Sequence, residues 1–132
     1  MRDKFYQTDF YRFKYEDDIM FMTYINGPIT LDIAKEIVAK RCEKMNKEDV
    51  FILIDDMNLK SIDQEARAYL SSDEGVKGLK AGALVVSSAF SKHMANFFLK
   101  ITVNKQKIPT RLFTDRQEAI DWLNELKANE AE

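Results

Sequence analysis

Residues 51–66 read FILIDDMNLKSIDQEA, in which an apolar run passes into two adjacent aspartates and then into a polar turn. With Val50 included, the run from Val50 to Ile54 contains no polar side chain. A short strand of this composition is typical of a sheet that is covered on both faces. We therefore predict a central strand at Val50–Ile54. After the turn we predict a helix whose first N–H groups are capped by Ser61 or Asp63.

A β-hairpin is predicted before this strand. Phe10–Tyr15 and Ile19–Ile25 are rich in aromatic and β-branched residues, and the charged sequence EDD between them suits a tight connection. Apolar residues at helical spacing then predict a helix from its N-cap Thr30 to about Asn46. The chain thus opens with two antiparallel strands and a helix.

The rest of the chain continues to alternate between helices and strands. Apolar spacing predicts helices near 62–70 and 90–101, and a last helix opened by a capping box that starts at Thr114. Short apolar runs predict strands at Ala81–Ser88 and Ile108–Thr114. The order β-β-α-β-α-β-α-β-α predicts an α/β sandwich with a mostly parallel sheet and an antiparallel strand at or near one edge.

The composition is that of a soluble globular protein, and its length suits a single domain over residues 1–132. A net charge of -2 provides no broad field toward nucleic acid or an anionic membrane, so we expect no nucleic-acid partner. No apolar run approaches about 18 residues, and the N-terminus lacks the apolar core of a signal peptide. We expect a cytoplasmic protein without stable membrane insertion.

Cysteine and histidine are each present once, as Cys42 and His93. An intrachain disulfide is therefore impossible, and an ordinary structural zinc site is excluded. Cys42 falls within an apolar helical pattern and is interpreted as a packed thiol. His93 has no conspicuous Ser or Cys nucleophile motif nearby, so it is interpreted as a helix residue without acid–base function. We expect no cofactor.

The element order and the turn LKSIDQEARAYL at Leu59–Leu70 resemble the SpoIIAA-like group, which is related to the STAS domains of bacterial anti-sigma-factor antagonists. In STAS domains a turn after a buried strand carries an Asp-Ser-Ser-Gly-type motif at the start of the next helix. Asp63 matches the Asp, whereas Gln64 and Glu65 stand where the serines would be and Ala66 where the glycine would be. The resemblance implies a regulatory protein-interaction domain with a SpoIIAA-like sandwich, here without the usual phosphoacceptor serine.

A phosphoserine switch, if retained, would have to use other serines. Ser61, Ser71 and Ser72 are the candidates, but none is in the position that the resemblance implies. A serine near a helix start is usually a cap, and this is our interpretation of Ser61.

Asp55 and Asp56 offer another chemistry. Ligands of open α/β sheets bind beyond the carboxyl ends of strands, where two carboxylates can hold a divalent cation or accept a phosphoryl group. Phosphoryl-accepting receiver domains also need an acceptor Asp after another strand, but the strand from Ala81 ends in Ser87 and Ser88. We therefore favour a solvated strand end.

We predict a non-enzymatic regulatory or protein-interaction module with a protein partner. Its contact residues are expected in the opening stretch: Asp55, Asp56, Asn58, Ser61, Asp63, Gln64 and Glu65. One alternative is a small-molecule or lipid-binding protein, because the broad fold group also resembles CRAL-TRIO-like lipid carriers. A deep apolar pocket would favour it. A third is a metal-dependent enzyme using Asp55 and Asp56. Oligomeric state stays open, a homodimer included.

Overall fold

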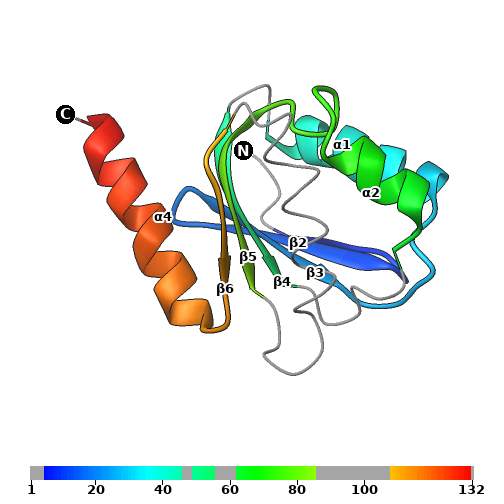
Figure 1. The fold of residues 1–132 in the computed structure, drawn as a ribbon, viewed down its shortest axis with the longest axis horizontal. Coiled ribbons are helices and arrows are strands. Elements are labelled where there is room, and N and C mark those ends of the chain that lie inside the picture. Colours follow the sequence, from blue (N-terminus) through cyan, green and yellow to red (C-terminus); the bar gives the residue numbers. More distant parts are fainter. Residues whose placement is uncertain (1–4, 46–48, 56–61, 86–107, 132) are drawn as a thin grey trace.

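The computed structural model describes residues 5–45, 49–55, 62–85 and 108–131. The elements are β1 (Phe5–Gln7), β2 (Tyr11–Glu16), β3 (Ile19–Tyr24), α1 (Leu31–Lys44), β4 (Val50–Asp55), α2 (Gln64–Leu70), β5 (Leu79–Val85), β6 (Thr110–Phe113) and α4 (Arg116–Ala131). The strands form one six-stranded sheet with helices on both faces (Figure 1). The helix predicted near 90–101, with His93, lies outside the described residues.

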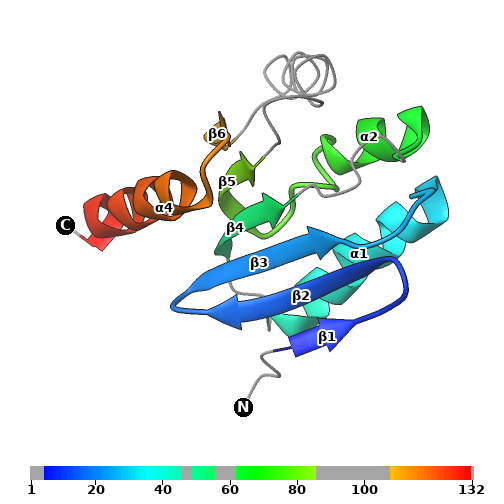
Figure 2. The ribbon, with the colours of Figure 1, turned by 90° about the horizontal axis from the view of Figure 1, so that it is seen from below.

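The strands of the sheet follow one another in chain order, from β1 at one edge to β6 at the other (Figure 2). β1, β2 and β3 pair antiparallel, whereas β3, β4, β5 and β6 pair in parallel. Parallel pairs need crossover connections, and α1 and α2 lie within those from β3 to β4 and from β4 to β5. The predicted α/β class, mixed sheet and central β4 are confirmed. The edge strand β1 was missed, because three residues are too short to show a period.

The turn of the predicted hairpin is formed by Asp17 and Asp18, both of which have positive φ angles, 53° and 67°. Glu16 and Ile19 pair directly across it, so the loop contains two residues. Two-residue loops with positive φ twist in the sense that the flanking strands require, and aspartate tolerates this conformation better than most residues. The tight connection predicted from EDD is confirmed.

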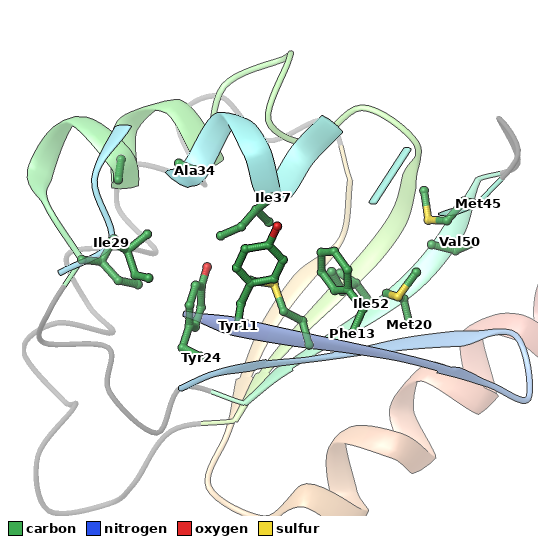
Figure 3. Close-up of a cluster of buried hydrophobic side chains, with 13 residues drawn as sticks. Tyr11, Phe13, Met20, Tyr24, Ile29, Ala34, Ile37, Met45, Val50 and Ile52 are labelled. Atoms are coloured by element: carbon green, nitrogen blue, oxygen red, sulfur yellow. The ribbon is translucent and has the colours of Figure 1, made fainter. Parts of the chain in front are cut away.

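One face of the sheet packs against α1 and α2. Tyr11 and Phe13 of β2 are buried on this face, whereas Arg12 between them is exposed, as the alternation of a strand requires. Figure 3 shows both rings between the sheet and α1, close to Ile37 of that helix. The two rings are 5.3 Å apart and tilted, which is a favourable geometry for an aromatic pair.

The opposite face of the sheet is covered by α4 (Figure 1). Phe51 and Leu53 of β4 pack there with Ala119 and Leu123 of α4, whereas Ile52 belongs to the cluster under α1 and α2. Because successive residues of β4 enter two different cores, none of the residues from Val50 to Leu53 is exposed. This explains the unbroken apolar run.

The buried stripe of α1 includes a charged residue. Its buried positions recur at helical spacing: Ala34, Ile37, Val38 and Arg41, followed by Met45 at the C-cap. Cys42, which we predicted in this stripe, is only half-buried, and its thiol lies 3.8 Å from the Lys77 carbonyl oxygen. The sequence pattern favours Cys42 over its neighbour Arg41 because arginine is not an apolar residue.

Of the three predicted helix caps, that of α1 is confirmed, that of α4 is corrected, and that of α2 is confirmed in the position of Asp63 but not in its side-chain bond, while Ser61 lies outside the described residues. The Thr30 hydroxyl accepts a hydrogen bond from the Ile33 N–H at 3.3 Å, as predicted. Asp63 occupies the N-cap position of α2, but its side chain forms no capping hydrogen bond. Asp115, not Thr114, caps α4, because its Oδ1 accepts from the Gln117 N–H at 2.8 Å. The predicted capping box was wrong by one residue, since aspartate caps at least as well as threonine.

Candidate functional site

The structure describes four of the seven residues predicted for the site. Asp56, Asn58 and Ser61 lie outside the described residues. Asp55 is the last residue of β4, half-buried and paired with Thr23 of β3 and Val85 of β5. It therefore belongs to the sheet and not to the turn, and β4 ends one residue later than predicted.

The remaining predicted residues, Asp63, Gln64 and Glu65, lie beside the start of α1. Ile29 and Ile62, which precede the two helices, form a parallel β-bridge. The Asp63 N–H donates to the Ile29 carbonyl oxygen at 3.0 Å. Each of the two bridged segments continues directly into a helix, so the starts of α1 and α2 are held next to each other. They form an open surface groove, called here the α1–α2 groove, lined by Thr30, Leu31, Asp32, Asp63, Gln64 and Glu65.

The α1–α2 groove is acidic. Asp32, Asp63 and Glu65 are exposed, and none of them is in the ion pairs formed among the described residues. Asp32 and Glu65 are in the first turns of their helices, where the helix dipole stabilises a negative charge. The groove thus offers solvated carboxylates to a cationic group, and the Asp63 carboxylate is not used for capping.

Asp32 and Thr30 were not predicted as site residues. The signal that could have found them is a shared spacing, since Asp32 follows the N-cap Thr30 by the same two positions as Glu65 follows Asp63. Nothing in the sequence places these two segments side by side, because the Ile29–Ile62 bridge joins residues far apart in the chain.

A second site is an apolar cavity under the C-terminal half of α1, which we call the Arg41 cavity. Its walls come from β3, α1, β4, the end of α2 and β5, and they include Met22, Ile37, Arg41, Ile52, Leu70 and Leu84. The volume of the cavity is about 60 Å³, within a wider hollow that opens to solvent. Apolar side chains form most of the wall, and Arg41 brings a charge into it.

Arg41 is only 3% exposed. Its Nη2 donates to the carbonyl oxygens of Gly75 at 3.0 Å and Lys77 at 2.7 Å, which ties α1 to the turn before β5. Its Nε–H has no hydrogen-bond partner in the part of the chain that the structure describes. Burial lowers the pKa of Arg41 from its ordinary value, while Cys42 and Tyr24 act in the opposite direction. An arginine nevertheless stays charged in a protein.

A family model described as a domain of unknown function, DUF7793, matches residues 13–127. The chain belongs to the DUF7793 family. The matched region begins in β2 and ends in α4, so both the α1–α2 groove and the Arg41 cavity lie within the DUF7793 domain. No curated protein and no solved structure matches the chain.

Two serines that could act as phosphoacceptors in this DUF7793 domain use their hydroxyl groups in hydrogen bonds at the end of α2. Ser71 is buried, and its hydroxyl donates to the carbonyl oxygens of Arg67 and Ala68. The Ser72 hydroxyl donates to the Tyr69 carbonyl oxygen and accepts from the Gly75 N–H at 3.1 Å. Both hydroxyls thus terminate the helix, and phosphorylation would break these bonds. Ser61 lies outside the described residues.

The described ranges of the DUF7793 domain contain neither a cluster of metal-ligating side chains nor a membrane-spanning helix. Within them, no three His, Cys, Asp or Glu side chains are close enough together to hold a metal ion. Asp55 contributes to no such group there, and Asp56 is outside the described part. No described helix is long and apolar enough to span a membrane.

Proposed function

We propose that this DUF7793 domain is a non-enzymatic protein-interaction module, and that a basic segment of its partner contacts the α1–α2 groove. The observation that carries the proposal is the convergence of Asp32, Asp63 and Glu65 at two adjoining helix starts. These carboxylates are exposed and unpaired among the described residues, and a complementary positive surface would steer association and fix its register.

A regulatory role of the SpoIIAA-like kind is the finer part of this proposal. In the domains that the chain resembles, the start of the helix after the central strand carries the switch motif. Here Asp63, Gln64 and Glu65 occupy that place at the start of α2, directly in the groove. The mixed sheet with an antiparallel hairpin supports the same assignment. We propose that the contact surface is retained, with constant negative charge in place of a phosphorylated serine.

Removing the charge of the groove is expected to weaken partner binding. The triple variant Asp32→Asn, Asp63→Asn and Glu65→Gln keeps the shape of the groove but removes its carboxylates. A partner captured from lysate by the wild-type domain, and then purified, should bind the variant at least about tenfold more weakly in calorimetry. The loss should shrink as salt rises, because salt screens exposed charges.

A matched control separates the groove from total charge. Glu118→Gln, Asp121→Asn and Glu125→Gln remove the same number of exposed carboxylates from α4, on the other face of the sheet. This variant should bind the partner like the wild type. Equal weakening by both triple variants would show that only net charge matters, and unchanged binding by the groove variant would refute the proposal.

A further inference from the structure

One half of the sheet carries exposed side chains on the side where α4 packs. Among the described residues, the cluster that α4 closes takes its members from β3, β4, β5 and β6, and none from β1 or β2. In Figure 2, β1, β2 and β3 lie in front of α1, and α4 lies beside them. We call the α4-side surface of these three strands the open half. At the usual strand spacing of about 4.8 Å it is about 10–14 Å wide, which matches one helix with its side chains.

The open half is basic and contains an exposed aromatic ring. Phe5, Lys14 and Phe21 lie directly across from one another on its three strands. Phe5 is 56% exposed, and Phe21 is half-buried. Lys14 and its neighbour on the same face, Arg12, are both exposed, and Lys14 forms an ion pair with Glu16 at 3.5 Å. Because exposed ion pairs are weak, this surface stays attractive to an anionic partner.

The outer surface of α4 is acidic. Ala119 and Leu123 are fully buried against the sheet, one helical turn apart. Asp121 lies two positions from each of them and therefore points away from the sheet, and both Asp121 and Glu125 are exposed. The Gln117 side-chain amide donates to the Asp121 Oδ1 at 3.0 Å, which orients that carboxylate. Asp121 and Glu125 form what we call the acidic ridge.

Contacts near both ends of α4 fix the ridge relative to the open half. The Lys127 Nζ donates to the Asp17 carbonyl oxygen at 2.9 Å, in the turn between β2 and β3. At the start of the helix, the Arg116 guanidinium lies over the Phe21 ring, 5.0 Å from its centroid, and adds a further cation at the border of the open half. The ridge therefore cannot fold back onto the open half of its own chain.

A second copy of the chain can bring the two surfaces together. In a face-to-face pair related by a two-fold axis, α4 of each copy lies on the open half of the other, and the contact closes. Asp121 and Glu125 then meet Arg12 and Lys14 of the other copy. We propose that the chain forms a symmetric homodimer in which α4 of each copy packs on β1, β2 and β3 of the other.

The homodimer is separate from the proposed contact with a protein partner. The α1–α2 groove belongs to helices on the opposite face of the sheet, so it stays open in the dimer (Figure 1). Each chain then binds its partner in the same way as a monomer or as a dimer. An acidic segment of a different protein would be attracted to the same open half, but it would not make the chain dimerise on its own.

Sedimentation equilibrium of the purified chain tests the dimer directly. A small polar contact is of the weak kind, so the chain should be mostly monomeric at about 5 µM and mostly dimeric at about 500 µM. The dimer fraction at a fixed protein concentration should fall as salt rises from about 50 mM to about 500 mM, because salt screens exposed charges.

A charge swap identifies the two surfaces. Arg12→Glu with Lys14→Glu makes the open half acidic, whereas Asp121→Lys with Glu125→Lys makes the ridge basic. All four positions are exposed, so circular dichroism should show the wild-type fold for both variants. Each variant alone should stay monomeric at about 500 µM, since both of its contacts join like charges. An equimolar mixture should dimerise again, because both contacts of the mixed pair join opposite charges.

The control reverses two exposed cations elsewhere. Lys35→Glu on α1 with Lys77→Glu in the turn bound to α1 should dimerise like the wild type. A wild-type chain that is monomeric at about 500 µM would overturn the proposal, including the case in which an acidic protein occupies the open half. Reversal variants that still dimerise alone, or a mixture that stays monomeric, would overturn it as well.

Discussion

Leu53→Asp is expected to abolish folding of the domain. Leu53 is 1% exposed in the middle of β4 and pairs with Phe21 of β3 and Ala83 of β5. It packs in the cluster that α4 closes with Leu123. A carboxylate at this position would be buried without a partner, which costs more than about 5 kcal/mol and so removes most or all of the stability of a small domain. Far-UV circular dichroism should show loss of the cooperative thermal transition.

The control for Leu53→Asp is the same residue type at a solvent-facing strand position. Arg12 of β2 is exposed between the buried residues Tyr11 and Phe13, so Arg12→Asp introduces a carboxylate into a strand without burying it. This variant should melt cooperatively and lose at most about 1 kcal/mol, the range of strand propensities. If Leu53→Asp melted like Arg12→Asp, the central position of β4 would be wrong.

The double burial of β4 is the feature that the sequence predicts best, and the reason is physical. A strand with one face in solvent carries polar residues at every second position. The unbroken apolar run from Val50 to Ile54 therefore indicates a strand that is buried on both faces. The antiparallel hairpin follows from equally local information, since Asp17 and Asp18 fit the two-residue turn between Glu16 and Ile19. Both features depend on residues close together in the chain.

Features that depend on distant residues were not predictable in this way. Arg41 occupies a helical position that is suited to burial, but a charged residue is not expected in a core from sequence alone. Its burial is explained by the carbonyl oxygens of Gly75 and Lys77, which accept hydrogen bonds from it in the structure. Asp32 joins Asp63 only because Ile29 bridges to a residue after β4. The candidate site was thus half predicted: the α2 side follows from the turn motif, whereas the α1 side and the Arg41 cavity require the tertiary structure.

Gly75→Ala is expected to be strongly destabilising, and more so than the same change at Gly78 or Gly82. A Cβ atom at Gly75 would lie 2.7 Å from both the carbonyl carbon and the carbonyl oxygen of Leu70, and closer still to the carbonyl oxygen of Tyr69. These are backbone atoms, so no rotation of a side chain can relieve the overlap. Either the end of α2 or the turn itself must move.

That movement is opposed from both sides of Gly75. Its N–H donates to the Ser72 hydroxyl at 3.1 Å, and its carbonyl oxygen accepts from Arg41 at 3.0 Å. A shift that clears Tyr69 therefore weakens at least one of these bonds, and loss of the second leaves the Arg41 guanidinium with fewer acceptors. Overpacking that displaces backbone costs about 3 kcal/mol, and urea denaturation should show a loss of this size.

Gly82→Ala is the matched comparison, with the same added methyl group in a different environment. A Cβ atom at Gly82 would meet the Ile52 Cγ2 atom at 3.5 Å, which is ordinary contact, and it would enter the Arg41 cavity. Replacing a strand glycine restricts the unfolded chain, so stability should stay level or rise by about 0.5–1 kcal/mol. Equal stability of the two variants would mean that the Gly75 turn yields freely. Arg41 would then not hold that turn in place, and its burial would need another explanation.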